Sequence, residues 1–217
     1  MSFGRAQNVV PFWGPSEARA ILQGRDPSIL SQIGAPGIGA AIWQREPLAE
    51  FLDWIETQPV ANLPSLRTLV AVDAVEACIH AACESAQTPA SRMRDMLVSD
   101  IAALAYIMSE IMQTPLLHLR LDIGTTDACR RFHVDNLTAR MLCTYRGAGT
   151  QIAQPGQENA PLDLITAAAA ILRGTLWPGR EKTGLLHRSP PISGTGQSRL
   201  LLVIDPGTDY RPGRAVH

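Results

Sequence analysis

The hydrophobic pattern of this chain changes its period near residue 113, and this change limits the folds that the chain can adopt. Before that point, apolar residues recur at helical spacing. From Pro115 onward, in the segment LLHLRLDI, leucine and isoleucine alternate with histidine, arginine and aspartate, as in a half-buried strand. The sequence therefore predicts one domain with a mainly helical part, residues 1–112, a β-rich part, residues 113–205, and a flexible tail, residues 206–217.

The N-terminal part contains three predicted helices. Pro47 can open the first, and the segment SLRTLVAVDAVEACIHAACESA forms the second. Thr88 is suited to cap the third helix, with Pro89 at its first helical position. The third helix carries the clearest apolar stripe in the chain, formed by Met93, Leu97, Ile101, Leu104, Met108 and Ile111.

The C-terminal part consists of short strand candidates separated by turns rich in glycine, proline and asparagine. After LLHLRLDI, these candidates are FHVDN, ARMLCTY, AAAAILRG and RLLLVID. The segment IGAAIW, residues 38–43, adds a strand from the N-terminal part. Because almost no helix intervenes between the C-terminal candidates, the pattern indicates an antiparallel sandwich or barrel.

Composition excludes some classes of function. With 46% hydrophobic residues, the chain of 217 residues can bury one sizeable core. The net charge is −1 and the basic residues are scattered, which argues against a nucleic-acid or anionic-membrane partner. No apolar run is long enough to span a bilayer, so we expect a soluble, cytoplasmic protein. The four cysteines form no CxxC pair and are predicted to be free thiols.

A histidine and an aspartate lie two residues apart in the segment CRRFHVDN. On a strand, His133 and Asp135 would share a face, with Cys129 on that face too if the strand extends back. His187 in the segment GLLHRSPP supplies a third ligand. Two histidines and one carboxylate form the facial set that leaves open positions on a non-haem Fe(II). Arg199, at the start of RLLLVID, is suited to bidentate capture of a carboxylate.

The order of these residues resembles that of the Fe(II)- and 2-oxoglutarate-dependent oxygenases, especially their prolyl-hydroxylase-like branch. The resemblance covers roughly residues 115–205 and rests on an ordered set: His133 and Asp135, then Arg140, Thr144, Tyr145, Gly147, Gly149 and Thr150, then His187, Pro190, Pro191 and Arg199. The amino-acid sequence of the segments CRRFHVDNLTARMLCTYRGAGTQ and LLHRSPP is also similar to that of an uncharacterised bacterial family of unknown function. Members of that family often lie in gene neighbourhoods linked to zinc supply.

The oxygenase resemblance implies an α+β fold, in which a double-stranded β-helix (a jelly-roll, cupin-like barrel) packs against the N-terminal helices. It further implies that His133, Asp135 and His187 hold Fe(II), while Arg199 and Tyr145 hold 2-oxoglutarate. The implied reaction is hydroxylation or demethylation of a C–H bond, coupled to oxidative decarboxylation of the cosubstrate. The substrate is expected to be a small molecule or a protein, and a homodimer is possible.

Three other interpretations stay open. In the first, the same ligands, with Cys129 as a possible fourth, form a closed tetrahedral zinc site in a protein of zinc homeostasis. In the second, the chain is a degenerate barrel that has kept the fold and lost the chemistry. In the third, His133 and Asp135 are a hydrogen-bonded pair at a strand edge, and Arg199 pairs with a surface carboxylate. An arginine that receives an anion distinguishes the oxygenase from the closed zinc site.

Overall fold

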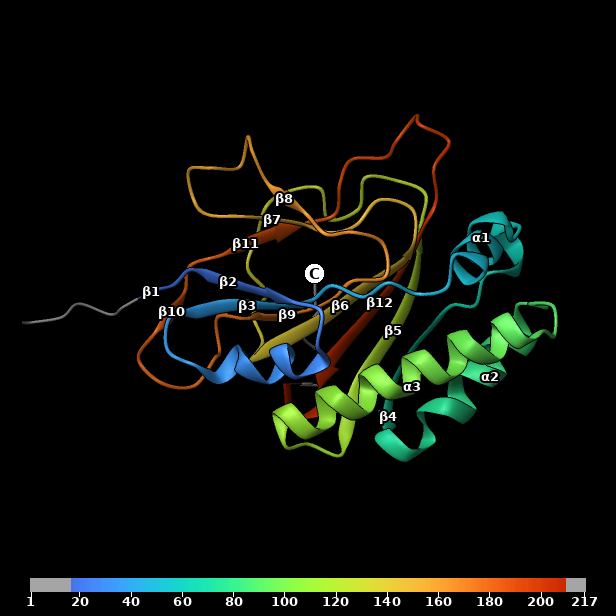
Figure 1. The fold of residues 1–217 in the computed structure, drawn as a ribbon, viewed down its shortest axis with the longest axis horizontal. Helices are drawn as coiled ribbons and strands as arrows, with labels where there is room; N and C mark the ends of the chain where they lie inside the picture. Colours follow the sequence, from blue (N-terminus) through green and yellow to red (C-terminus); the bar gives the residue numbers. More distant parts are fainter. Residues whose placement is uncertain (1–16, 210–217) are drawn as a thin grey trace, which may run out of the picture.

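A seven-stranded mixed sheet organises the computed structural model, which describes residues 17–209 (Figure 1). The β2–β3 pair is parallel, and every other neighbouring pair in this main sheet is antiparallel. In spatial order, the strands are β2 (Ala20–Gly24), β3 (Ile38–Trp43), β9 (Ala169–Arg173), β6 (Ala139–Arg146), β12 (Arg199–Pro206), β5 (Leu116–Gly124) and β4 (Leu66–Ala71).

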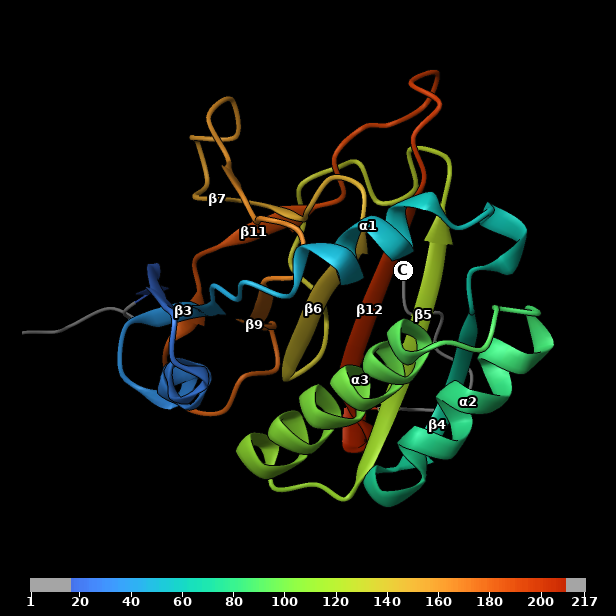
Figure 2. The same ribbon diagram turned by 45° about the vertical axis from the view of Figure 1, so that its right-hand side comes forward.

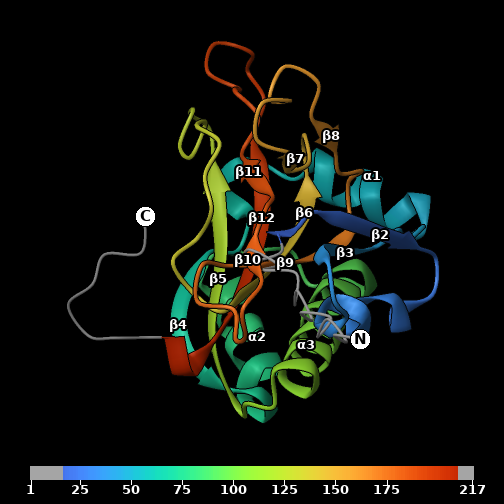
Figure 3. The same ribbon diagram turned by 90° about the vertical axis from the view of Figure 1, so that its left-hand side faces the viewer.

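Two smaller sheets complete the β-structure. A three-stranded antiparallel sheet has the order β11 (Leu186–Arg188), β7 (Gln151–Ala153) and β8 (Leu162–Asp163). A short parallel pair joins β1 (Glu17–Ala18) to β10 (Lys182–Thr183). Figures 1 and 3 show the three-stranded sheet on the side of the main sheet opposite to α2 and α3. An apolar cluster that includes Leu142, Ile152 and Val203 fills the space between the two sheets.

The helices cover the other face of the main sheet (Figure 2). They are α1 (Ala49–Thr57), α2 (Val75–Ser85) and α3 (Arg92–Met112). Short 3-10 segments occur at η1 (Pro27–Gly34), η2 (Val60–Asn62), η3 (Val72–Ala74) and η4 (Gly207–Asp209). The predicted stripe of α3 is buried from Met93 to Met108, and Ile111 is partly buried. It packs in the same cluster as Leu117, Leu119 and Leu121 of β5, which confirms the predicted alternation.

Two of the helix predictions need correction. The segment predicted as one helix over residues 65–86 divides into β4 and α2, because residues 66–71 pair with β5 and form the edge of the main sheet. The long helix begins at Arg92 and not after Thr88. The Ser91 hydroxyl caps it by accepting from the Arg94 N–H, whereas the Thr88 hydroxyl donates to the Asn62 carbonyl.

The strand predictions succeed with one exception. The segments at residues 38–43, 116–123, 139–145, 169–173 and 199–205 lie in β3, β5, β6, β9 and β12. The segment FHVDN does not form a strand, and a single bridge between His133 and His187 is its only ladder contact. The N-terminal part also contributes β1 to β4, so it is less helical than expected. The predicted tail lies mainly outside residues 17–209, and Pro206 still belongs to β12.

Two further observations bear on the class of protein. Within residues 17–209, none of the helices combines the length and hydrophobicity needed to cross a membrane. The four cysteines are free thiols, as predicted: Cys83 and Cys143 are buried, and Cys129 is exposed.

A buried polar cluster joins β6 to the helical layer. The Tyr145 hydroxyl donates to Asp100 Oδ2 at 2.5 Å, and Arg45 Nη1 donates to Asp100 Oδ1 at 2.6 Å. Arg45 Nη2 also contacts Cys143 Sγ at 3.2 Å. Burial raises the pKa of Tyr145 well above its usual value, and nearby Cys143 and Asp100 act in the same direction. Tyr145 is therefore a neutral donor that ties β6 to α3.

Removing the Tyr145 hydroxyl should destabilise the fold. We expect Tyr145→Phe to lower the free energy of unfolding by about 1 to 2 kcal/mol, because Asp100 loses a charge-assisted hydrogen bond. Urea unfolding of the parent and the variant measures the difference. Tyr106→Phe is the matched control, since Tyr106 is 59% exposed, and it should change stability by less than about 0.5 kcal/mol. An equal effect of both variants would contradict the assigned role.

Candidate metal centre

The backbone brings His133 and His187 together. The His133 N–H donates to the His187 carbonyl at 3.1 Å, and the His187 N–H donates to the His133 carbonyl at 3.0 Å. These bonds form the bridge between the loop before β6 and strand β11, and the two imidazole centroids lie 4.5 Å apart. Asp135 follows two residues after His133. One ligand atom from each of the three side chains lies within 4.8 Å of the other two, so the three can share one ion.

The hydrogen bond of His133 prepares its other ring nitrogen for a metal. Its Nδ1 lies 2.9 Å from the backbone carbonyl of Arg131, and a carbonyl can only accept. Nδ1 therefore carries the proton in the neutral ring, which leaves the Nε2 lone pair free. Nε2 is the atom that lies toward Asp135, at 3.7 Å from Oδ1.

Asp135 is buried and has one oxygen without a hydrogen bond. Its Oδ1 accepts from Arg140 Nη1 at 2.5 Å. Its Oδ2 lies 3.1 Å from His187 Nε2 but makes no hydrogen bond. Burial would raise the pKa of Asp135, but His187, Arg140 and His133 outweigh that effect and hold the pKa below its usual value. A buried, ionised oxygen beside two imidazoles fits a divalent cation, because an uncompensated buried charge is costly.

Arg140 forms a second layer behind this carboxylate. Its Nε and Nη2 donate to the two oxygens of Asp205 at 2.7 and 2.8 Å, while Nη1 holds Asp135. Burial would lower the pKa of Arg140, but Asp205 and Asp135 outweigh that effect and raise it. The guanidinium therefore fixes the orientation of Asp135 and directs Oδ2 toward the histidines.

Arg199 is a buried cation whose partners are all neutral. Its Nε donates to the Ala148 carbonyl at 2.6 Å, its Nη1 to the Ser189 hydroxyl at 2.7 Å, and its Nη2 to the Thr144 hydroxyl at 3.3 Å. Within residues 17–209 it forms no ion pair with a carboxylate. Burial lowers the pKa of Arg199 to about 10. An unpaired buried guanidinium on this face is a site for an anion.

Two glycines fix the loop that supplies the Ala148 carbonyl. Gly147 has a φ of +74°, and a Cβ there would meet the Ser198 carbonyl oxygen at 2.5 Å. A Cβ at Gly149 would meet the Leu164 carbonyl oxygen at 1.8 Å. A larger residue at either position would displace the loop from Arg199.

The prediction for Tyr145 needs correction. Strand alternation on β6 directs Arg140, Leu142 and Thr144 to the face that carries the histidine cluster, whereas Tyr145 lies in the apolar core beneath the helices. Its hydroxyl is held by Asp100. The hydroxyls that lie next to Arg199 belong to Thr144 and Ser189. Thr144 was predicted only as a member of the ordered set, and Ser189 was given no role. Two-residue alternation already places Thr144 on the same face of β6 as Arg140.

Cys129 does not join the three side chains that could hold one ion. The group of residues that could hold one ion, among residues 17–209, contains only His133, Asp135 and His187. Cys129 is exposed and has a φ of +59°. Its carbonyl accepts from the Ser189 N–H at 3.0 Å, so its loop lies beside the last histidine strand. The described side chains therefore offer three ligands and leave positions for others.

Comparison with known sequences gives a family. The model of the family described as "Protein of unknown function (DUF1826)" matches residues 24–205. The chain belongs to this family. The match includes His133, Asp135, His187 and Arg199. No curated protein matches the sequence.

Comparison with solved structures gives the fold. The dioxygenase for auxin oxidation 1 from Arabidopsis thaliana, solved with 2-oxoglutarate, matches with a TM-score of 0.51 and 11% identity, over 86% of this chain and 91% of that one. The rice dioxygenase for auxin oxidation matches with a TM-score of 0.49 and 15% identity, over 89% and 86%. A Pseudomonas putida prolyl-4-hydroxylase matches with a TM-score of 0.43 and 11% identity, over 82% and 96%. The DUF1826 chain thus has the predicted α+β double-stranded β-helix fold.

Metal binding by this cluster can be measured directly. We expect the metal-free DUF1826 protein to bind one equivalent of Co(II). Loss of a residue that only supports a metal ligand costs roughly 10- to 100-fold in metal affinity. Asp135→Asn changes a ligand itself, so it should weaken Co(II) binding by at least that much. Calorimetric titration gives both stoichiometry and affinity. Asp163→Asn is the control, because Asp163 is an exposed carboxylate on β8. Unchanged affinity in Asp135→Asn would exclude Asp135 as a ligand.

Proposed function

We propose that this DUF1826 protein is an Fe(II)- and 2-oxoglutarate-dependent dioxygenase of the hydroxylase or demethylase type. The observation that carries the proposal is Arg199, a buried guanidinium without a carboxylate, on the same face of the main sheet as the His133, Asp135 and His187 cluster. A metal site alone has no use for such a group. A bidentate organic acid that chelates the metal at one end needs a cation for its other end.

Each residue has a distinct role in this proposal. His133 and His187 provide neutral imidazole nitrogens, and Asp135 provides the charged oxygen that Arg140 leaves free. The bound Fe(II) supplies the oxidative chemistry with dioxygen, for which a two-histidine, one-carboxylate set leaves open positions. Arg199 receives the distal carboxylate of 2-oxoglutarate, and the hydroxyls of Thr144 and Ser189 orient the guanidinium.

The surroundings of these residues support the exclusion of water from the cosubstrate. Arg199, Thr144 and His187 are each less than 8% exposed. The cluster of Leu142, Ile152 and their neighbours closes the space between the two sheets. In such a site the attraction between Arg199 and a carboxylate is stronger than at the surface. His133 is the more open ligand, with 31% of its side chain exposed, so the substrate, a small molecule or a protein side chain, approaches from that side.

A closed zinc site is the second candidate. It is disfavoured because Cys129, the only cysteine near the cluster, lies outside the set of converging ligands. It is disfavoured further because it gives no role to Arg199. A degenerate barrel would differ from an active dioxygenase in forming no succinate, so measurement of succinate separates these two.

The proposal is tested by anaerobic titration of the Fe(II)-loaded protein with 2-oxoglutarate, following the visible charge-transfer band of the chelate. We expect Arg199→Gln to weaken 2-oxoglutarate binding about 10- to 100-fold, the equivalent of about 1.5 to 3 kcal/mol, with metal affinity little changed. His133→Ala should abolish the band.

Arg188→Gln is the matched control for the loss of a charge near the site. Arg188 follows His187, but its guanidinium stacks on Phe132 and donates to Gln151, so cosubstrate affinity should be retained. Absence of a band in the parent, combined with tight zinc binding that 2-oxoglutarate does not perturb, would contradict the oxygenase and favour the zinc protein. A normal band without succinate formation in the presence of dioxygen would indicate a degenerate barrel.

A further inference from the structure

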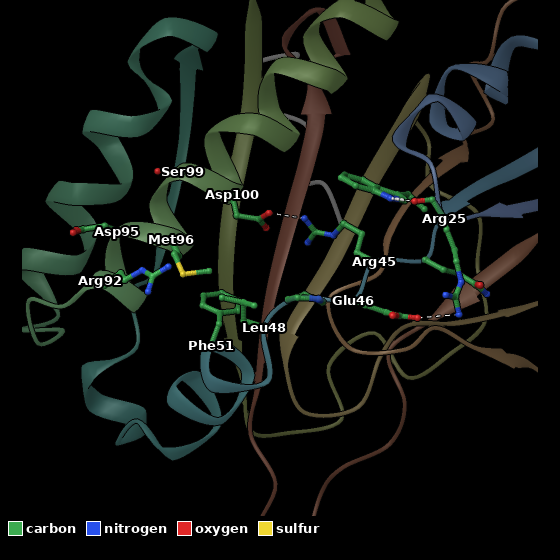
Figure 4. A pocket seen from close by; sticks show the side chains of 13 residues that line it. Arg25, Arg45, Glu46, Leu48, Phe51, Arg92, Asp95, Met96, Ser99 and Asp100 are labelled. Carbon is green, nitrogen blue, oxygen red and sulfur yellow. Dashed lines mark hydrogen bonds and ion pairs between the residues drawn. The ribbon is translucent and has the colours of Figure 1, made fainter.

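A cleft lies on the helical face of the main sheet, away from His133, Asp135 and His187. It has a volume of about 840 Å³ and lies between the segment that follows β3, helix α1 and helix α3 (Figure 4). Its floor contains Arg45, which contacts Cys143 on β6. Cys143 faces the helices, whereas its neighbours Leu142 and Thr144 face the metal side. The main sheet therefore separates the two sites, and the volume is that of a small-molecule site.

The walls of the cleft are largely apolar. Apolar side chains come from β3, the segment that follows it, α1 and α3: Trp43, Pro47, Leu48, Phe51 and Met96. Leu48, the residue just before the first turn of α1, is 52% exposed, whereas Phe51 and Ile55 of that helix are buried. An apolar concavity with an exposed leucine at its edge favours a ligand with an apolar body.

The floor of the cleft is polar, electrically neutral and fixed. Asp100 is bonded through one oxygen to Arg45 and through the other to Tyr145. Arg45 also donates to the Ala167 carbonyl, at 2.7 Å, and to Cys143. This cluster carries one positive and one negative charge. It therefore shapes the cleft without selecting the sign of a ligand's charge.

The formal charges that line the cleft balance, three arginines against three carboxylates, but a positive charge that forms no ion pair within the described part of the chain turns inward. At one side of the mouth, Arg25 pairs with Glu46 at 2.9 Å. At the other side, Arg92 forms no ion pair within residues 17–209, and Figure 4 shows its guanidinium turned inward beside Met96. Asp95, one turn further along α3, points away from the centre of the cleft in the same view. Charge complementarity therefore favours an anionic group near Arg92.

We propose that this cleft binds a small organic acid with an apolar, ring-sized body. The carboxylate contacts Arg92, and the body lies against Phe51, Met96 and Trp43 above the Asp100 floor. This proposal does not rest on the proposed dioxygenase function, because none of the residues that line the cleft belongs to the His133, Asp135 and His187 group or contacts Arg199 directly.

The test uses a matched pair of probes, 2-naphthoate and its neutral analogue 2-naphthalenemethanol. Each probe is titrated calorimetrically into the full chain. Excess 2-oxoglutarate is present to occupy the Arg199 site. We expect saturable binding of 2-naphthoate to one site. Arg92→Gln should weaken 2-naphthoate about fivefold, the effect of an ion pair at a partly exposed position, and leave the alcohol unchanged. Arg67→Gln, which removes an exposed arginine on β4, should change neither affinity.

A second variant tests the location through shape. Ser99 is an exposed residue of α3 that lines the cleft, so Ser99→Trp should fill it and abolish binding of both probes, whereas Ser99→Ala should not. Urea unfolding checks that the variants keep the parental fold. No saturable binding by the parent, or parental affinity in Ser99→Trp, would overturn the proposal. Equal weakening of the acid and the alcohol by Arg92→Gln would overturn the assignment of the anion.

Discussion

Strand β6 is buried on both faces, and its alternation decides which residues reach which site. Arg140, Leu142 and Thr144 face the three-stranded sheet, where Arg140 holds Asp135. Cys143 and Tyr145 face the helices, where they contact Arg45 and Asp100. A shift of register by one residue would exchange the two sets. The apolar partners on both faces and the paired charges on both faces therefore specify the same register.

Asp135 and Arg199 are buried charged groups that each lack, among residues 17–209, part of the partners that would satisfy them. Arg140 lies between Asp135 and Asp205, so this guanidinium compensates two carboxylates. A second arginine, Arg120, approaches Asp205 at 3.6 Å. Asp135 keeps one oxygen without a hydrogen bond, and Arg199 keeps its charge without a carboxylate. Since a buried polar atom without a hydrogen bond and a buried charge without a counter-ion are both costly, a cation at Asp135 and an anion at Arg199 would recover free energy.

The sequence predicts the strands and the ligands better than the local backbone around them. Period-two alternation located β5, a strongly apolar run located β12, and the spacing of His133 and Asp135 identified a pair that does converge with His187. The pair does so from an irregular loop with one bridge and not from a strand, because hydrogen bonds to β11 fix only His133. The boundary of β4 was missed because this leucine-rich segment has a helical pattern, but pairing with β5 makes it a strand. Strand β5 lies far along the chain, so the local sequence does not indicate this pairing.

The role of Asp205 could have been read from the sequence. It lies six residues after Arg199 on the same strand, so the two side chains share a face by alternation. A carboxylate at the end of a strongly apolar strand needs a buried partner, and Arg140 on the neighbouring strand is the basic residue that alternation places there. The resemblance assigned Tyr145 by its place in an ordered motif, whereas alternation on β6 places its side chain on the helical face, where its hydroxyl donates to Asp100.

The two faces of β6 are joined by one residue outside the strand. Ala167 has a φ of +67°, a conformation that costs an alanine about 1 kcal/mol or more. Its N–H donates to the Thr144 carbonyl at 2.7 Å, and its carbonyl accepts from Arg45 Nε at 2.7 Å. These bonds compensate the strain, and they connect the floor of the helical cleft to the residue whose hydroxyl contacts Arg199. Displacement of Arg45 would therefore release the backbone that positions Thr144, so the rigidity of the Arg199 site depends on the charge pair on the other side of the sheet.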